Sequence, residues 1–194
     1  GTGGIYLHHS GFRGANSQLD AFAFRSGRSR ETSFDTDYDQ LVELLKHDKD
    51  NGHIVWVLGP AAIFNIGARN AMEYILDNGY AHAVFGGNAV GTHDLEGALF
   101  GTALGQDLRT RENRHNGHYN HLDTINMINK AGSIRAGISG LEIDNGLIYS
   151  CVKNDVPFVL AGSIRDDGPL HDVIDDMSAV QDAMREHTKQ ATTI

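Results

Sequence analysis

The sequence predicts an α/β fold built on a parallel sheet with helices on both of its faces. Three short apolar runs, at 53–58, 81–85 and 157–161, are each followed by glycine, and segments with helical periodicity separate them. Continuous apolar runs of this length are typical of strands that are buried on both faces of a parallel sheet. A strand–helix–strand order joins such strands by right-handed crossovers, which place helices over the sheet.

The helices are predicted from periodicity and from their end signals. The first helix begins at Asp37 and ends at Asp50-Asn51-Gly52, and the second runs from about 65 to 76 with Asn78-Gly79 as its C-cap. A short helix is predicted at 94–100, and a long polar stretch follows at 105–117. Further helices are predicted at 121–129, 141–153 and 171–187, and an apolar segment begins at 191–194. The apolar face of the first helix consists of Tyr38, Leu41, Val42, Leu44 and Leu45.

The chain divides into two regions at about residue 36. Residues 1–36 are rich in glycine, carry four arginines and lack a long apolar periodicity, so we interpret them as an arm or as the remnant of a preceding domain, with a floppy terminus as the alternative. Residues 37–194 form the α/β domain. Three strands make a thin sheet, and the sequence ends within the apolar segment that begins at 191. We therefore expect an incomplete fragment whose C-terminal part is missing.

Composition and charge exclude several classes of protein. The chain has 194 residues, of which 40% are hydrophobic, and its net charge is −9. This charge disfavours binding to nucleic acid or to an anionic membrane, but it suits a small cationic substrate. No apolar run is long enough to span a membrane, and no signal peptide is visible. The single cysteine, Cys151, cannot form an internal disulfide, which predicts a cytoplasmic protein.

The loops that follow the predicted strands carry the candidate ligand-binding residues. Ligands of open parallel sheets bind at the carboxyl ends of the strands, so we expect 86–94 and 162–170 to converge at one edge. Neither loop matches a G-x-G-x-x-G fingerprint or a P-loop. Asn88 follows two glycines and could reach a ribose or a carboxamide, although it could also turn the chain or cap a helix. Asp166 could bind a ribose diol or could belong to a solvated turn.

Other polar residues have competing interpretations. Asp94 and Glu96 open a predicted helix, where capping of the helix explains these carboxylates at least as well as a functional role does. Histidines at 115, 118 and 121 lie three apart, but glycine interrupts them, so we expect a polar loop and no metal site. Cys151 lies among apolar residues in a predicted helix, which indicates a buried, unreactive thiol.

Three long stretches, at 86–101, 117–134 and 151–170, resemble one known family. They include Gly86-Gly87-Asn88-Ala89-Val90-Gly91-Thr92-His93-Asp94-Leu95-Glu96 and Ala161-Gly162-Ser163-Ile164-Arg165-Asp166-Asp167-Gly168-Pro169. The chain resembles the LOR/SDH bifunctional-enzyme conserved domain family over roughly residues 34 to 187. This family comprises archaeal-type NAD-dependent ornithine cyclodeaminases and the C-terminal region of cyanobacterial arginine dihydrolase/ornithine cyclodeaminases.

The resemblance implies a fold, a cofactor and a reaction. The fold would be a Rossmann-like one similar to the NAD-binding domain of deoxyhypusine synthase, and the cofactor would be NAD, contacted by Asn88, Ala89 and Asp166. The reaction would convert L-ornithine to L-proline and ammonia, with NAD as a regenerated hydride acceptor. His93 and Asp94 are the candidates for catalytic proton transfer because their loop adjoins Asn88, and capping is the alternative for both. We also expect a homo-oligomer.

Two other functions remain open at this point. The domain could be a non-catalytic NAD-binding regulatory or assembly module of a larger enzyme, or it could belong to a net NAD-dependent amino-acid dehydrogenase. A fold by itself does not separate these possibilities from an ornithine cyclodeaminase.

Overall fold

The computed structural model of the chain describes residues 35–194, with the exception of residues 165 and 167. Residues 39–194 form one compact unit, and the description that follows concerns this unit. The arm or domain remnant predicted at 1–36 lies almost entirely outside the described residues and stays a prediction.

The centre of the unit is a three-stranded parallel sheet, as the apolar runs predict. Strands β1 (Val55–Val57), β2 (Ala83–Gly87) and β5 (Phe158–Ala161) lie in the order β1-β2-β5. The register pairs Val57 with Phe85, and Gly87 with Ala161, so the carboxyl ends of β2 and β5 lie level with each other. The predicted strands and their parallel arrangement are confirmed.

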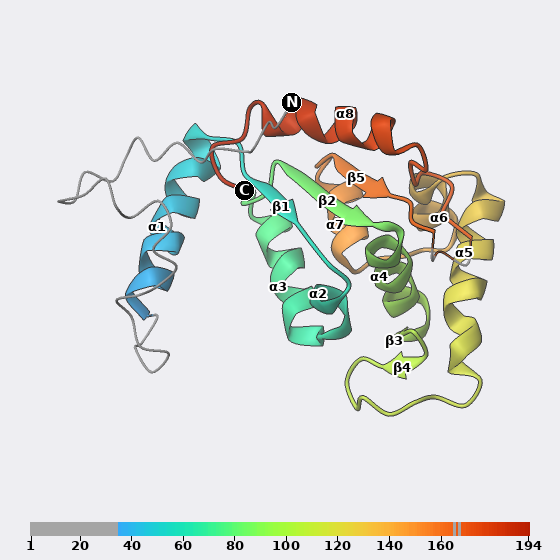
Figure 1. Cartoon of the computed structure of the whole chain (residues 1–194). Helices are drawn as coiled ribbons and strands as arrows, with labels where there is room; N and C mark the ends of the chain where they lie inside the picture. Colours follow the sequence, from blue (N-terminus) through green and yellow to red (C-terminus); the bar gives the residue numbers. More distant parts are fainter. Residues whose placement is uncertain (1–34, 165, 167) are drawn as a thin grey trace. The chain divides into compact units, whose positions relative to one another are not determined.

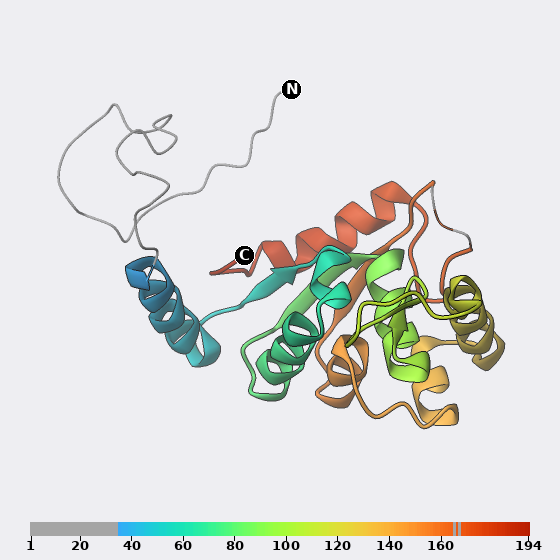
Figure 2. The ribbon, with the colours of Figure 1, turned by 90° about the horizontal axis from the view of Figure 1, so that it is seen from below.

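Helices cover both faces of this sheet (Figures 1 and 2). On one face, Val84 and Leu160 belong to the main core together with residues of α3 (Ile66–Asp77), α4 (Asn88–Phe100) and α7 (Leu147–Lys153). On the other face, Phe85 and Val159 pack against α8 (Met177–Thr188). Alternate residues of each strand therefore enter two separate cores, because successive side chains of a strand point to opposite faces.

Apart from α1 (Asp35–Asn51), the remaining elements lie around the main core on the side of α3 and α4. Two short strands pair in an antiparallel manner directly after α4. The sequence did not predict these strands, because each consists of only two residues. The elements not yet named are α2 (Ala61–Phe64), β3 (Thr102–Ala103), β4 (Gln106–Asp107), the 3-10 helix Gly117–Tyr119, α5 (Asn120–Ala131) and α6 (Ile134–Gly140).

The apolar segment at 191–194 lies along the outer edge of β1. Thr193 forms a parallel bridge with Ile54, and the backbone N–H of Val55 donates to the Thr193 carbonyl at 2.9 Å. The connections from β1 to β2 and from β2 to β5 step across the sheet in one direction. The connection through α8 runs from β5 back across the sheet to the outer edge of β1. It lies on the opposite face, because right-handed crossovers that run in opposite directions must use opposite faces of a sheet.

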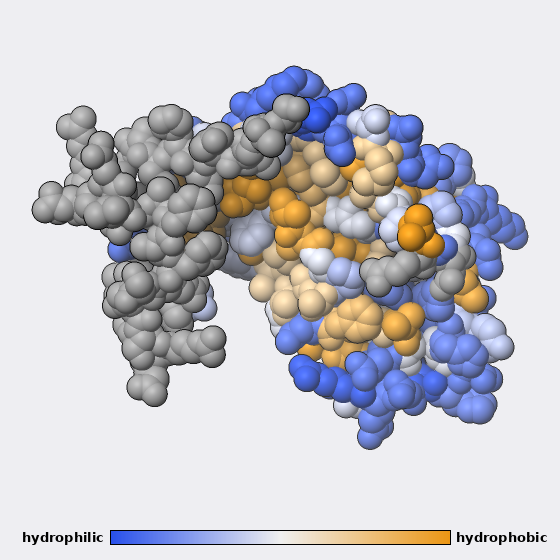
Figure 3. All heavy atoms as spheres, in the orientation of Figure 1, coloured by the Kyte–Doolittle hydropathy of each residue, from blue (hydrophilic) through white to orange (hydrophobic). Residues whose placement is uncertain are grey.

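Helix α8 covers only part of its face of the sheet. Apolar surface extends over the region of β1 and β2 beside α8 in the space-filling view (Figure 3). Val57, which lies on the same face as Val55, is 63% exposed. The carboxyl end of β1 is therefore open on this side.

Helix α4 begins at Asn88, six residues before the predicted start at 94. The sequence Asn88-Ala89-Val90-Gly91 contains a glycine, which lowers helix propensity and conceals the first turns of this helix. Tertiary packing explains the glycine. A Cβ atom at Gly91 would lie 2.7 Å from Leu160 Cδ1, so glycine is what allows α4 to approach β5 closely.

Helix α8 begins later than predicted, at Met177 and not at 171. Ile174 instead forms a parallel bridge with Ala161, so the chain before α8 pairs with the end of β5. Asp176 then caps the helix, because its side chain accepts the backbone N–H of Ala179 at 2.7 Å.

Helix α7 also begins later than predicted, at Leu147 and not at 141. Two residues before it have positive φ angles, 53° at Glu142 and 112° at Gly146. These conformations are incompatible with a continuous helix.

Hydrogen bonds to one carboxylate of α1 hold the C-terminal segment in place. Asp48 is 5% exposed, and its Oδ2 accepts the hydroxyls of Thr192 and Thr193 at 2.7 and 2.6 Å. The hydrogen bond from Thr193, followed by those from His47 and Thr192, lowers the pKa of Asp48 to about 2. The predicted apolar face of α1 is otherwise open, since Leu41, Val42 and Leu44 are 44–47% exposed.

We expect Asp48→Asn to reduce the stability of the domain at pH 7 and to flatten its acid dependence. The contribution of Asp48 is fully present above the ordinary pKa of 3.8. It is lost as the pH falls through the folded-state pKa of about 2. The variant should be less stable by about 1–2 kcal/mol at pH 7, and the difference should shrink between pH 4 and pH 2. Urea unfolding at several pH values measures this, with Asp39→Asn on the same helix as the control. An equal difference at every pH would contradict the assignment.

Candidate functional site

A cavity of about 350 Å³ lies beside the carboxyl ends of β2 and β5, where the sequence predicts a ligand site. The predicted convergence of 86–94 and 162–170 at one edge is confirmed, with the first turn of α4 meeting the loop after β5. The cavity contains four of the five predicted site residues and leaves out Asp94. Its lining residues are Asn88, Ala89, His93, Leu104, His121, Ser163 and Asp166.

Asn88 connects the first turn of α4 to the loop after β5 and leaves its amide donors available. It is 5% exposed, and its Oδ1 accepts the backbone N–H of Leu170 at 3.0 Å and the hydroxyl of Thr92 at 3.3 Å. Its Nδ2 has no hydrogen-bond partner among the residues that the structure describes. The N-cap residue of α4 is Gly87, so the alternative that Asn88 caps this helix is wrong.

The N-terminus of α4 is also open. Gly87 provides no side-chain acceptor for the amides of the first turn. A helix of 13 residues carries a partial positive charge at such an end, where free N–H groups favour an anion. Asn88 and Ala89, which line the cavity, belong to this turn.

Asp166 lies in the cavity wall that the loop after β5 provides. Its carboxylate accepts the backbone N–H of Ser163 at 2.8 Å and the Ser163 hydroxyl at 3.1 Å. These two bonds close a turn, as the alternative interpretation of Asp166 requires. The same carboxylate lines the cavity, so the geometry is also compatible with a ligand contact.

His93 is held in the cavity wall by a neighbouring carboxylate. It is 8% exposed, and its Nδ1 lies 2.8 Å from Oε2 of Glu96. The edge of its ring packs against Phe64, with ring centroids 5.2 Å apart, and the His121 ring lies 6.1 Å away. Sequence reasoning missed this contact of Glu96. The three-residue spacing of His93 and Glu96 would have indicated it once the helix was known to begin at Asn88.

Asp94 faces away from the cavity, although it directly follows His93. It is 1% exposed, and it accepts Nε of Arg69 at 2.8 Å and the backbone N–H groups of Leu147 and Ile148 at 3.0 and 2.7 Å. Burial raises the pKa of Asp94, whereas Arg69 and the two amides act in the opposite direction. Successive helix residues point about 100° apart, which allows His93 and Asp94 to face different neighbours. This carboxylate connects α4 to α3 and α7 and does not line the cavity, so the geometry gives no support to its predicted role in proton transfer.

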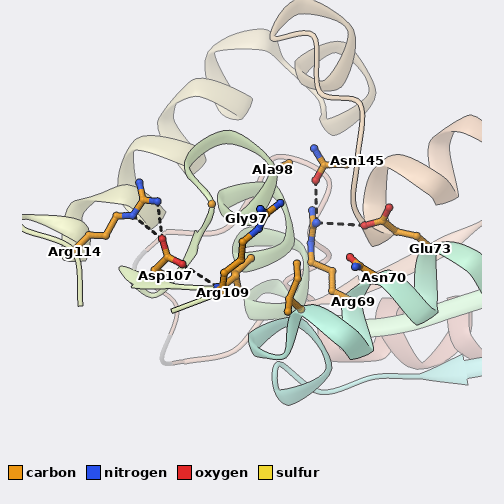
Figure 4. Close-up of a pocket in the computed structure, with 12 residues that line it drawn as sticks. Arg69, Asn70, Glu73, Gly97, Ala98, Asp107, Arg109, Arg114 and Asn145 are labelled. Carbon is orange, nitrogen blue, oxygen red and sulfur yellow. Dashed lines mark hydrogen bonds and ion pairs between the residues drawn. The ribbon is translucent and has the colours of Figure 1, made fainter. Parts of the chain in front are cut away.

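A second cavity, of about 740 Å³, lies on the outer side of α3 and α4 (Figure 4). Arg69 reaches into it and donates to Asn145 at 2.9 Å and to Glu73 at 3.3 Å. On another wall, Arg114 contacts Asp107 at 2.6 Å. Burial raises the pKa of Glu73, although Arg69 acts against this. This cavity is the larger of the two, but it does not lie at the strand ends, and most of its charged groups are already paired. The smaller cavity is therefore the candidate site.

Several other chemistries have no visible site in residues 35–164, 166 and 168–194. No group of three or more His, Cys, Asp or Glu side chains in this part of the chain is arranged to hold a metal ion. No helix within it is long and apolar enough to cross a membrane. Cys151 is fully buried, as predicted, and burial raises the pKa of its thiol, which disfavours the reactive thiolate form.

The parallel sheet, the helices on both of its faces and the ligand cavity at the strand ends define a Rossmann-fold domain. The family described as "Arginine dihydrolase ArgZ-like, C-terminal, Rossmann fold" matches residues 39–194. The chain belongs to this family. The resemblance and the fold inferred from the sequence are thereby confirmed.

Three known proteins illustrate the relationship. The ornithine cyclodeaminase of Methanopyrus kandleri is 47% identical over 155 residues, which are 80% of this chain and 37% of that protein. A conserved LOR/SDH protein from Methanococcus maripaludis has a crystal structure that matches with a TM-score of 0.77 and 38% identity, over 82% of this chain and 50% of the other. AgrE, crystallised as a ternary complex with ornithine and NAD+, matches with a TM-score of 0.77 and 38% identity, over 84% of this chain and 24% of its own. The chain thus spans little more than a third of the length of the Methanopyrus relative.

Proposed function

We propose that this domain binds NAD and belongs to an ornithine cyclodeaminase, which converts L-ornithine to L-proline and ammonia. The observation that carries the proposal is the cavity in which Asn88, Ala89 and Asp166 meet at the open N-terminus of α4. The likeness to AgrE, whose structure contains ornithine and NAD+, supports the identity of the ligands.

The residues around the cavity suit a dinucleotide. The free amides of the first turn of α4 can bind the pyrophosphate, and the Asp166 carboxylate can accept hydrogen bonds from ribose hydroxyls. The unpartnered Nδ2 of Asn88 can donate to a further oxygen of the cofactor. These three groups come from the first turn of α4 and from the loop after β5, which the β2–β5 pairing holds side by side.

The reaction needs one redox group and at least one group that moves protons. When bound, NAD supplies a hydride acceptor that later returns the same hydride, so that ornithine gives proline and ammonia with no net oxidant consumed. Of the two predicted proton-transfer residues, His93 lies in the cavity and Asp94 does not. We therefore assign proton transfer to His93.

The test uses the full-length protein with ornithine and a catalytic amount of NAD. We expect proline and ammonia in equal amounts, with no lasting rise in the absorbance of NADH. Steady accumulation of NADH would instead identify a net amino-acid dehydrogenase, and NAD binding without ammonia release would identify a regulatory or assembly module. A protein without affinity for NAD would contradict the proposal as a whole.

We also propose that the protein is a cytoplasmic homo-oligomer. The open apolar face of α1, with Leu41, Val42 and Leu44 exposed, supports an association between chains. A buried cysteine and an acidic surface are compatible with the cytoplasm. Light scattering of the purified full-length protein measures the oligomeric state.

A further inference from the structure

Glu96 is a fully buried carboxylate directly behind the candidate site. Its exposed fraction is 0%, and it accepts four hydrogen bonds, two on each oxygen. Oε1 accepts the Thr102 hydroxyl at 2.7 Å and the backbone N–H of Gly105 at 2.9 Å. Oε2 lies 2.9 Å from the backbone N of Leu104 and 2.8 Å from Nδ1 of His93. A buried charge needs this degree of satisfaction to be tolerated.

These hydrogen bonds keep Glu96 ionised. Burial opposes ionisation, but the bonds from His93, Gly105, Thr102 and Leu104 together hold the pKa of Glu96 below its ordinary value. An ionised carboxylate has no proton to donate, so the 2.8 Å contact requires that Nδ1 of His93 carries the hydrogen. The neutral His93 ring is then fixed in its Nδ1–H tautomer, and Nε2 is the nitrogen that gains and loses a proton.

The same carboxylate also holds a strained part of the cavity wall. Leu104 lines the cavity and has a φ angle of 49°, in the left-handed region that side chains with a Cβ rarely adopt. Gly105, with a φ of 75°, packs so closely against Gly117 that a Cβ at Gly105 would lie 2.4 Å from the Gly117 carbonyl carbon. Glu96 accepts the N–H groups of both Leu104 and Gly105. Strain of this kind persists where the surrounding structure enforces it, often at functional sites.

We propose that Glu96 is a positioning residue, which fixes His93 in the tautomer that exchanges a proton with the bound ligand at Nε2 and which holds Leu104 in the cavity wall. Its role in catalysis rests on the proposed function, because it acts through His93. Four groups face the His93 ring from the surrounding elements. Three of them are in contact with or close to the ring: Glu96 on the same helix, His121 on α5 and the neutral ring of Phe64 on α2. The fourth, Asp166 in the loop after β5, lines the same cavity.

The first test needs no change at Glu96, no cofactor and no substrate. Nitrogen-15 NMR of the histidine rings in the full chain, assigned by comparison with His93→Ala, reports the tautomer of His93 directly. We expect the Nδ1–H form throughout the range in which the ring is neutral. An Nε2–H form in the unsubstituted protein would overturn the proposal. This readout remains valid whether or not the protein cyclises ornithine.

The second test compares Glu96→Gln with the matched exposed control Glu186→Gln. Loss of the anionic partner should allow both neutral tautomers of the His93 ring. In the full-length enzyme kcat should fall about 100-fold, the low end of the range for general acid–base catalysis, while NAD affinity stays within about twofold. The control should change none of these quantities.

A double variant separates positioning from general damage to the fold. If Glu96 acts through His93, adding Glu96→Gln to His93→Ala should cost little further activity. Losses of activity that multiply in the double variant, or an unchanged His93 tautomer in Glu96→Gln, would overturn the proposal. If Glu96→Gln does not fold, Thr102→Val removes one donor from Glu96 without touching His93, and it should leave the His93 tautomer unchanged.

Discussion

Replacing Asp94 with asparagine is expected to lower the free energy of unfolding by about 3–5 kcal/mol, because it deprives a buried guanidinium of its nearest carboxylate. Arg69 is 3% exposed and its Nε donates to Asp94. The same carboxylate accepts the first two amides of α7, whose N-cap residue Gly146 has no side-chain acceptor. The substitution therefore weakens the contacts of α4 with two helices at once.

Urea unfolding of Asp94→Asn measures this effect, and Asp155→Asn is its control. Asp155 also contacts an arginine, Arg135, at 3.1 Å, but the two side chains are 84% and 67% exposed. Exposed pairs contribute at most about 1 kcal/mol, so the control should stay within that limit. A loss below about 1 kcal/mol in Asp94→Asn would contradict the structural role derived for Asp94.

The second large effect is expected in the binding of NAD. Asp166→Ala in the full-length protein should weaken NAD binding by roughly 5- to 150-fold, since a buried hydrogen bond lost from one side costs about 1–3 kcal/mol. The loss has two sources, because Asp166 lines the cavity and also closes its own loop through Ser163. Asp166→Asn keeps one oxygen that can accept the Ser163 N–H, so it should weaken binding less.

Titration calorimetry with NAD checks this prediction, with Lys189→Ala as the control. Lys189 lies at the end of α8, where it forms an exposed ion pair with Glu186. The control should bind NAD as the unsubstituted protein does. Equal affinity of Asp166→Ala and the control would remove Asp166 from the cofactor site.

The strands and the position of the site could be predicted from the sequence because both depend on local patterns. An apolar run such as 81–85 indicates a buried strand in many different folds. The carboxyl ends of parallel strands always meet at one edge of the sheet. Asn88 and Asp166 were therefore placed correctly in one cavity, although 78 residues separate them.

The parts that could not be predicted depend on contacts between elements. The start of α4 was hidden because Gly91 serves close packing against Leu160, which no local pattern reveals. With the helix start misplaced, His93 and Asp94 looked like neighbours in one loop, whereas on a helix they point to different sides. The pairing of Asp94 with Arg69 follows from the packing of α3 against α4, so it could not be read from either segment alone.

The hydrogen bonds of Asp48 also have a consequence for the order in which the protein folds. Asp48 and Thr192 are 144 residues apart, whereas the contact of Ile54 with His82 spans only 28. Closing the longer loop costs about 1.5 kcal/mol more in chain entropy, so we expect the pairing of β1 with β2 to form first. During synthesis on the ribosome, the outer edge of β1 must then wait until residue 193 has emerged, and only at that point can the N–H of Val55 find its acceptor. A nascent chain of this domain therefore carries an unpaired strand edge through most of its translation, which is the stage at which aggregation through that edge is favoured.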